Sequence, residues 1–163
     1  MTKSSGLRNH ISKFKNCYPD YRFEEITNSN KEDAYKVMLD WCAENEIDIE
    51  HYEEKNAIRE ALDNMEEFKM HGGIVYVKDK AVAMTLGCEI SPIAFDICFE
   101  KALREYDGIY AVINNEFAKT LSSYKYINRE EDMGIEGLKK SKLSYNPIIL
   151  IARYNATLKN DRN

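Results

Sequence analysis

The sequence predicts an α/β domain: a central mixed, largely antiparallel sheet with helices on both faces. Three observations predict it. Apolar residues repeat with a helical period early in the chain, alternating strand-like runs joined by tight turns occupy its middle, and helices alternate with strands towards its end. Strands joined by short turns pair antiparallel, whereas strand–helix–strand steps bring parallel strands together.

Length and composition are those of a single soluble domain. The 163 residues are 44% hydrophobic and 31% charged, which suits one packed core. No apolar run reaches the ~18 residues of a membrane-spanning helix, and residues 1–10 lack the apolar stretch of a secretory signal. We therefore expect a cytoplasmic protein, with contact at a membrane surface left open. The expected organisation is a connector-like segment at 1–22, one domain at 23–156 and a polar tail at 157–163.

The first half of the chain predicts one strand and two clear helices. Residues 1–22 are polar with a weak helical repeat, and a short strand is expected at 22–26. The strongest amphipathic helix follows, because apolar side chains recur at helical spacing: Ala34, Val37, Met38, Trp41 and Cys42. A second helix is expected over 53–70, with these residues facing inward: Ile58, Ala61, Leu62 and Met65.

The second half predicts a run of strands and then alternating helices and strands. Strands are expected at 74–77, 81–90 and 93–101, followed by a helix at 109–124, a strand at 125–128, a helix at 134–143 and a closing strand at 148–154. In the third of these strands, strict alternation puts Phe95, Ile97 and Phe99 on one face, and Asp96, Cys98 and Glu100 on the other. The order β-α-α-β-β-β-α-β-α-β resembles that of the GNAT acyltransferase superfamily, a resemblance of fold that leaves the substrate open.

Net charge and cysteine content argue against two classes of function, broad nucleic-acid binding and metal binding. A net charge of −5 argues against broad binding to a nucleic-acid backbone. The four cysteines form no CxxC pair and the chain has only three histidines, so we expect no metal site and reduced thiols.

The turn that ends in Gly108 is a candidate phosphate site, because a helix N-terminus offers free N–H groups and a positive dipole end. It resembles the GNAT motif Gln/Arg-x-x-Gly-x-Gly/Ala, which grips the pyrophosphate of an acyl-CoA. By that resemblance the cofactor-binding residues are Asp107, Gly108, Ile109 and Tyr110. Two departures weaken the match: Glu105, at the first position, repels a pyrophosphate, and Tyr110, at the last, crowds the backbone. The alternative is a plain strand-to-helix turn.

Three stretches carry a wider resemblance: GGIVYVKDKAVAMTLG, EKALREYDGIYAVINNEFAKTL and YINREEDMGIEGLKKSKLSYNP. The last is the most specific, with the spacing Asn-Arg-Glu-Glu-Asp-x-Gly-x-x-Gly-Leu-x-x-x-Lys-x-Ser-Tyr-x-Pro. Together they resemble the phosphatidylglycerol lysyltransferase C-terminal domain family, a GNAT-like branch related to the Fem-type aminoacyltransferases. The resemblance covers residues 8–154.

Members of that family are usually about twice as long and look like two GNAT units in tandem. This chain resembles the second unit, and the stretch RNHISKFKNCYPDY resembles the connector between the units. A truncated form, a stand-alone relative and a subunit that dimerises to restore the tandem are all consistent with this. The resemblance thus implies either a homodimer or a missing N-terminal GNAT-like unit as partner.

Candidate catalytic residues lie in the third stretch. Acyl transfer needs a proton acceptor for the nucleophile, and Glu130 and Asp132 follow a strand end where GNAT folds open a cleft. Lys142 and Tyr145 lie on one helical stripe with Ile135 and Leu138. By resemblance, Tyr145 would protonate a leaving group, whereas Lys142 would meet a buried acid or anion. The alternatives are helix-dipole charges, a lysine that snorkels to solvent and a tyrosine in the core.

The expected substrate-binding residues flank the same cleft. They are Asn128, Arg129, Glu100, Lys101, Asn114 and Glu116. Arg129 could pair with a neighbouring carboxylate or grip a phosphate or carboxylate of the substrate with its planar fork.

The resemblance implies transfer of an acyl or aminoacyl group to an amine or hydroxyl acceptor, such as a small molecule or a lipid headgroup. The donor would be the acceptor end of an aminoacyl-tRNA or an acyl-CoA co-substrate, with no tightly bound cofactor. Two alternatives stay open: a CoA-dependent N-acetyltransferase for a small amine, and a non-catalytic unit used for binding or dimerisation. The last predicts a closed cleft, with Glu130 and Asp132 tied up in salt bridges. Tyr110 filling the cleft would favour this non-catalytic unit over the N-acetyltransferase.

Overall fold

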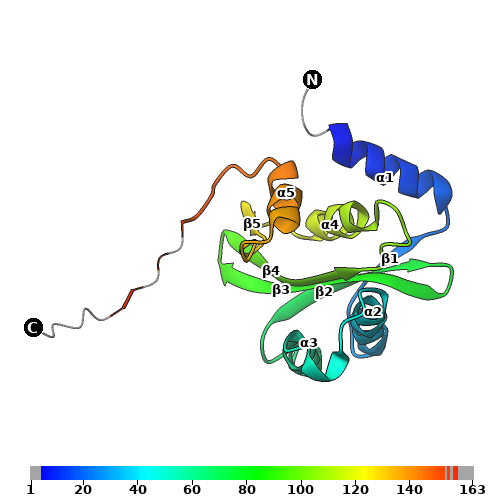
Figure 1. Cartoon of the computed structure of the whole chain (residues 1–163), viewed down its shortest axis with the longest axis horizontal. Helices are drawn as coiled ribbons and strands as arrows, with labels where there is room; N and C mark the ends of the chain where they lie inside the picture. Colours follow the sequence, from blue (N-terminus) through cyan, green and yellow to red (C-terminus); the bar gives the residue numbers. More distant parts are fainter. Residues whose placement is uncertain (1–4, 153, 155, 158–163) are drawn as a thin grey trace, which may run out of the picture.

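A mixed sheet of five strands forms the centre of the described chain in the computed structural model, which describes residues 5–152, 154 and 156–157 (Figure 1). The strands are β1 (Arg22–Glu25), β2 (Met70–Val77), β3 (Lys80–Ser91), β4 (Ala94–Ala102) and β5 (Tyr126–Asn128), in that spatial order. The first four pair antiparallel, whereas β5 runs parallel to β4 after a helical crossover. The predicted fold class is therefore confirmed.

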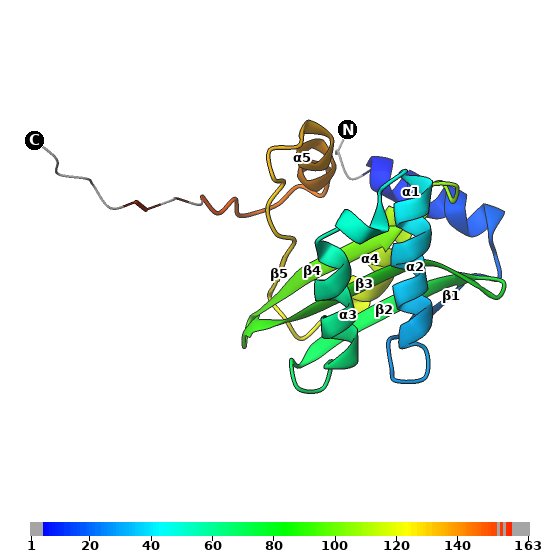
Figure 2. The same ribbon diagram turned by 60° about the horizontal axis from the view of Figure 1, so that its bottom comes forward.

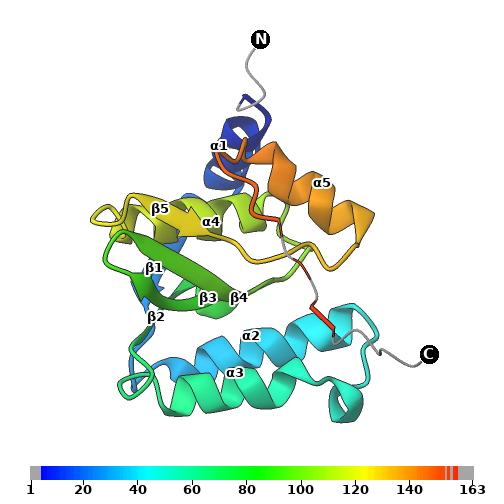
Figure 3. The same cartoon turned by 90° about the vertical axis from the view of Figure 1, so that its left-hand side faces the viewer.

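Helices cover both faces of the sheet, as Figures 1 and 3 show. One face carries α2 (Lys31–Glu44) and α3 (Glu54–Asp63), joined by the short 3-10 helix η1 (Ile49–His51). The other face carries α1 (Ser5–Cys17) and α4 (Ile109–Thr120), and α5 (Glu136–Ser144) lies on this same side of the sheet. The helix predicted at 53–70 ends at Asp63, where the side chain of Asn64 donates to the carbonyl of Glu60 and caps the helix end.

The two faces of the sheet bury separate apolar clusters. On the α2/α3 side, the predicted stripes are confirmed, since Val37, Met38 and Ile58 are fully buried against Ile74 and Leu86. On the other side, Phe14 of α1 is fully buried and packs with Val112 and Ile113 of α4. The sequence predicts a connector-like segment at 1–22. In the structure, helix α1 of this segment contributes Phe14 to the core of the domain.

A β-bulge in β4 overturns the expected alternation of its faces. Leu86 pairs with Phe99 but Gly87 pairs with Ile97, so Cys98 is the extra residue. Consequently Phe95 and Ile97 pack on the α4 side with Phe117, whereas Phe99 packs on the α2/α3 side. The prediction that Phe99 shares a face with Phe95 was wrong, because the bulge shifts the period-2 pattern by one residue.

The parallel pairing of β5 with β4 is short. Three residue pairs form it: Ala94 with Tyr126, Phe95 with Ile127 and Asp96 with Asn128. Beyond Asn128 the chain leaves the sheet, while β4 continues to Ala102. The later half of β4 therefore has no described strand on that side, which opens the sheet there.

The predicted closing strand at 148–154 is not formed. The described residues of that range, 148–152 and 154, belong to no strand, and Arg153 lies outside the described residues. In Figure 2 the chain after α5 runs away from the sheet. A strand needs a neighbouring ladder of backbone hydrogen bonds, and the apolar sequence of this segment cannot supply that ladder by itself.

Candidate functional site

A buried ion pair spans the opening between β4 and the end of β5. Nη2 of Arg129 donates to Oε1 of Glu100 at 2.8 Å, and the two side chains are 22% and 10% exposed. Asn114 of α4 donates its Nδ2 to the other oxygen of Glu100 at 3.3 Å. The remaining nitrogens of Arg129, Nε and Nη1, are buried without a hydrogen-bond partner among the described residues. Arg129 thus keeps two donors for a carbonyl, carboxylate or phosphate oxygen.

Tyr145 and Lys142 complete this cluster from the α5 side. The guanidinium carbon of Arg129 lies 4.3 Å from the centre of the Tyr145 ring, a cation–π geometry. Burial raises the pKa of Tyr145, while the charge of Arg129 acts in the opposite direction. The phenol is therefore protonated at neutral pH and able to donate a proton.

Lys142 anchors the loop that carries the predicted acids. Its ammonium donates to the carbonyl of Arg129 and, at 2.6 Å, to the carbonyl of Glu131. Burial lowers the pKa of Lys142, and the nearby charge of Arg129 acts in the same direction. Lys142 is thus half-buried and holds backbone, which differs from both the snorkelling lysine and the anion-bound lysine considered from sequence.

The loop after Arg129 is held in an unusual conformation. Glu130 and Met133 have left-handed φ angles of 55° and 51°, which non-glycine residues rarely adopt. Asp132 accepts a hydrogen bond from the N–H of Gly134 at 2.9 Å, so one of its carboxylate oxygens caps the loop. Asn128 donates to Asp96 at 2.6 Å and ties the end of β5 to β4.

Glu130 also approaches Asp96 and Cys98, and the three offer ligand atoms within 4.8 Å of one another. Burial raises the pKa of the Cys98 thiol to about 12, and the neighbouring Cys88 and Asp96 add to this.

A second cluster surrounds Lys101 on the α2/α3 face. Its ammonium lies 2.6 Å from Oε2 of Glu54 and 4.5 Å from the centre of the Trp41 ring. Tyr52 donates to the same Glu54 oxygen. Burial by itself would raise the pKa of Glu54, but hydrogen bonds from Lys101 and Tyr52 outweigh it and leave the pKa lowered. Glu100 and Lys101 are consecutive residues of β4 and therefore point to opposite faces of the sheet, so the two predicted substrate-binding residues lie in separate clusters.

Sequence reasoning missed Tyr52 and Glu54 and treated Trp41 as a core residue. Trp41 is only half-buried, and its indole N–H donates to the hydroxyl of Tyr110 at 3.0 Å. A pair of aromatic residues beside an acidic one, as in His-Tyr-Glu-Glu at 51–54, is a weak signal that could have drawn attention to this loop.

The backbone of α1 packs against the turn at Gly108. Gly108 has φ 87°, and a Cβ placed there would lie 2.6 Å from the backbone oxygen of His10. Asp107 pairs with Lys13, whose hydrogen bond and charge lower the pKa of that carboxyl. The N–H of Ile109 already donates to the carbonyl of Tyr106 at 3.0 Å. The four predicted cofactor-binding residues therefore lie at a turn that α1 covers.

Glu116 lies away from the other candidates. It accepts hydrogen bonds from Tyr21 at 2.9 Å and from Lys119 at 2.6 Å, and it pairs with Lys15 of α1 at 3.3 Å. Burial raises its pKa, but the bonds from Lys119 and Tyr21 outweigh that and leave the pKa lowered. This carboxylate ties α1 and Tyr21, the residue before β1, to α4.

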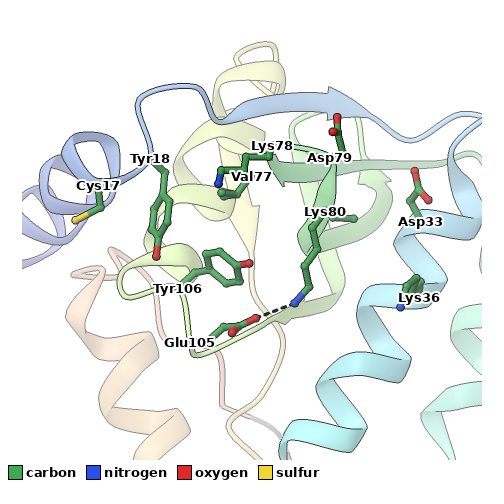
Figure 4. A pocket seen from close by; sticks show the side chains of 11 residues that line it. Cys17, Tyr18, Asp33, Lys36, Val77, Lys78, Asp79, Lys80, Glu105 and Tyr106 are labelled. Carbon is green, nitrogen blue, oxygen red and sulfur yellow. Dashed lines mark hydrogen bonds and ion pairs between the residues drawn. The ribbon is translucent and has the colours of Figure 1, made fainter.

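A hollow of about 860 Å³ lies at the far end of the sheet, between the β2–β3 turn and the loop before α4. Figure 4 shows Lys80 reaching Glu105 across it, at 2.8 Å, with Tyr18 and Tyr106 on one side. It contains none of the predicted site residues. Cations and carboxylates alternate along its wall, so it presents no single charge to a ligand.

The sheet, its opening beside β4 and the helix that follows define a GNAT-like, acyltransferase-type fold. A possible acetyltransferase from Clostridium difficile 630 matches 88% of this chain and 99% of its own, with TM-score 0.63 and 16% identity. AAC(6')-Iy in complex with the bisubstrate analog CoA-S-monomethyl-acetylneamine matches 86% of this chain and 98% of its own, with TM-score 0.61 and 8% identity. At these identities the likeness concerns the fold.

The family follows from a match over nearly the whole chain. Residues 2–157 match the model of the family described as phosphatidylglycerol lysyltransferase, C-terminal, and the chain belongs to that family. A conserved protein of unknown function from Bacteroides thetaiotaomicron VPI-5482 is 42% identical, with TM-score 0.85 over 92% of this chain. The chain spans 52% of that relative's length. A comparison with the curated proteins gives no match. Within the described residues, no helix is both long and apolar enough to cross a membrane.

Proposed function

We propose that this chain transfers an aminoacyl group from the acceptor end of an aminoacyl-tRNA to an amine or hydroxyl acceptor. The acyltransferase-type fold and the family membership support acyl transfer in general. The choice of donor rests on one observation, the closure of the Gly108 turn by α1. A pyrophosphate needs free backbone N–H groups and an open approach. The carbonyl of His10 lies against Gly108 on one side of this turn, and the acidic side chains of Glu105 and Asp107 oppose a phosphate further.

The reaction site in this proposal is the opening beside β4. Two donors of Arg129 have no hydrogen-bond partner among the described residues, and they suit the carbonyl oxygen of the donor ester as negative charge develops on it. Glu100 and Asn114 hold the guanidinium in place. Tyr145, protonated because burial raises its pKa, lies against the same guanidinium.

The transfer step assigns a role to each group. The acceptor nitrogen or oxygen attacks the ester carbonyl carbon, so that a new C–N or C–O bond forms and the ester C–O bond to the ribose breaks. Glu130, on its left-handed loop position, takes the proton of the nucleophile, with Asp132 as the neighbouring alternative. Tyr145 gives its proton to the departing ribose oxygen. Lys142 holds the loop in position by donating hydrogen bonds to the carbonyls of Arg129 and Glu131.

The test compares two donors with the same acceptors. The purified chain is incubated with tRNA charged with labelled amino acids, or with labelled acetyl-CoA. The acceptors are vesicles of phosphatidylglycerol or a mixture of free primary amines, and labelled product is measured after extraction. We expect product from charged tRNA only. Phosphatidylglycerol as acceptor would support a role at the membrane surface.

Paired tyrosine variants separate chemistry from folding. Tyr145→Phe should lower the rate by roughly 10²-fold or more, the range for loss of a general acid. Tyr154→Phe, at a residue 89% exposed, should leave it unchanged. Product from acetyl-CoA alone would overturn the choice of donor and favour the CoA-dependent N-acetyltransferase. A folded chain that transfers from neither donor would favour the non-catalytic unit.

A further inference from the structure

The apolar segment 148–152 has the composition of a β-strand but pairs with no strand among the described residues. Its sequence is Ile-Ile-Leu-Ile-Ala, rich in residues that favour strands. The side chains of Ile148, Ile149, Leu150 and Ile151 are 82%, 56%, 75% and 79% exposed. Within the described part of the chain, the backbone of this segment forms no hydrogen bond. Such a segment exposes both apolar surface and unpaired backbone groups, and both favour pairing with another strand.

The sheet of the same chain ends in an unpaired edge. β5 is the last strand in the order and pairs only with β4 among the described strands, so the N–H and C=O groups of its outer side face no strand. The surface around this edge is apolar. Ile127 of β5 is 37% exposed, and Ile90 and Ile93 at the adjoining β3–β4 turn are 57% and 54% exposed. Edge strands in monomers are normally protected by charge, proline or a covering element.

We propose that two copies of this chain dimerise by exchanging the segment 148–152, each copy adding it as a strand to the β5 edge of the other. The chain carries both halves of the contact, so a two-fold arrangement satisfies both edges at once and closes the assembly. In Figures 1 and 2 the chain leads away from its own sheet after α5, as exchange requires.

The size of the relative supports a second unit as the occupant. The Bacteroides protein contains the unit matched here, at TM-score 0.85, in about half of its length. The rest of the Bacteroides protein is about as long as the matched unit. A second copy of the present chain would supply the same amount. The inference concerns assembly and does not depend on which group the chain transfers.

The experiment measures oligomeric state and strand pairing together. Light scattering after size exclusion, over a wide range of concentration, should give twice the chain's mass of 19.0 kDa. Hydrogen exchange followed by mass spectrometry should show slow exchange in 148–152 and in β5. The double variant Ile149→Lys/Ile151→Lys should be monomeric with fast exchange in both segments, because lysine blocks edge pairing. Phe68→Lys, which introduces a single lysine at an exposed aromatic residue outside the sheet, should remain dimeric.

Three results would overturn the proposal. The first is a wild-type chain that stays monomeric with fast exchange in 148–152. The second is a monomer in which 148–152 is protected, since the strand would then pair within its own chain. The third is a dimer that survives the double lysine variant, since another surface would then hold the two copies together. Circular dichroism of the variants verifies that each is folded.

Discussion

The indole N–H of Trp41 on α2 donates a hydrogen bond to the hydroxyl of Tyr110 on α4, although these helices cover opposite faces of the sheet. The contact is possible because β5 leaves the sheet after Asn128, so that Tyr110 reaches past the later half of β4. Tyr110 thus packs at the start of α4 next to Gly108, against which the backbone of α1 is packed.

Removing the Tyr110 hydroxyl should destabilise the fold. Tyr110→Phe keeps the ring but leaves the Trp41 N–H without its acceptor, which costs about 1–3 kcal/mol for a buried donor. Urea unfolding followed by the fluorescence of the chain's single tryptophan measures this change directly. Tyr154→Phe, at a largely exposed side chain, is the matched control and should change stability little. A Tyr110→Phe protein as stable as wild type would mean that water replaces the hydroxyl.

Two glycine substitutions should act in opposite directions. Gly108→Ala should lower the free energy of unfolding by more than about 1 kcal/mol, because its φ of 87° disfavours a side chain and its Cβ would meet the carbonyl of His10. Gly137→Ala lies in α5, with no atom within 4 Å of the added Cβ. It should stabilise by about 0.5–1 kcal/mol through the lower backbone entropy of alanine. Thermal unfolding of both variants measures the difference, and equal effects would disprove the contact with α1.

Substitutions of Glu100 and Arg129 should have strongly non-additive effects on the free energy of unfolding. Arg129→Met leaves the carboxylate of Glu100 buried with only Asn114 as partner and should cost about 3 kcal/mol, since losing one member of a buried pair leaves the other uncompensated. The double variant Glu100→Gln/Arg129→Met should cost less than the sum of the two single changes. A double-mutant cycle in urea gives the interaction energy. Strict additivity would show that the pair is already well hydrated.

Alkaline pH should destabilise the chain through Tyr76. Burial and the hydrogen bond to Asp33 at 2.8 Å raise the pKa of this phenol in the folded state. Above the unfolded pKa of about 10, unfolded Tyr76 loses its proton while the folded residue keeps it, so the unfolded state binds fewer protons and stability falls as pH rises. Tyr76→Phe should therefore flatten the decline above pH ~10, whereas Tyr154→Phe should not. Urea unfolding at a series of alkaline pH values tests this, and an unchanged slope in Tyr76→Phe would exclude Tyr76 as the source.

The local elements of this protein are readable from its sequence, because each depends on residues close together in the chain. The helical repeat around Val37 and Met38 predicts α2, and the alternation at 74–77 and 81–90 predicts β2 and β3 within a few residues. The motif from Asn128 to Pro147 indicates where the candidate site lies, and the structure brings its Arg129, Lys142 and Tyr145 together.

Tertiary structure decided the partners of those residues. Arg129 pairs with Glu100, which lies 29 positions earlier in the sequence. The bulge at Cys98 turns the side chain of Lys101 to the α2/α3 face, and the alternation of residues in this strand does not predict that shift. The covering of Gly108 by α1 and the unpaired segment 148–152 likewise depend on where distant segments pack. Helices and turns satisfy their backbone within a short stretch, whereas a strand or an ion pair needs a partner that only the assembled fold provides.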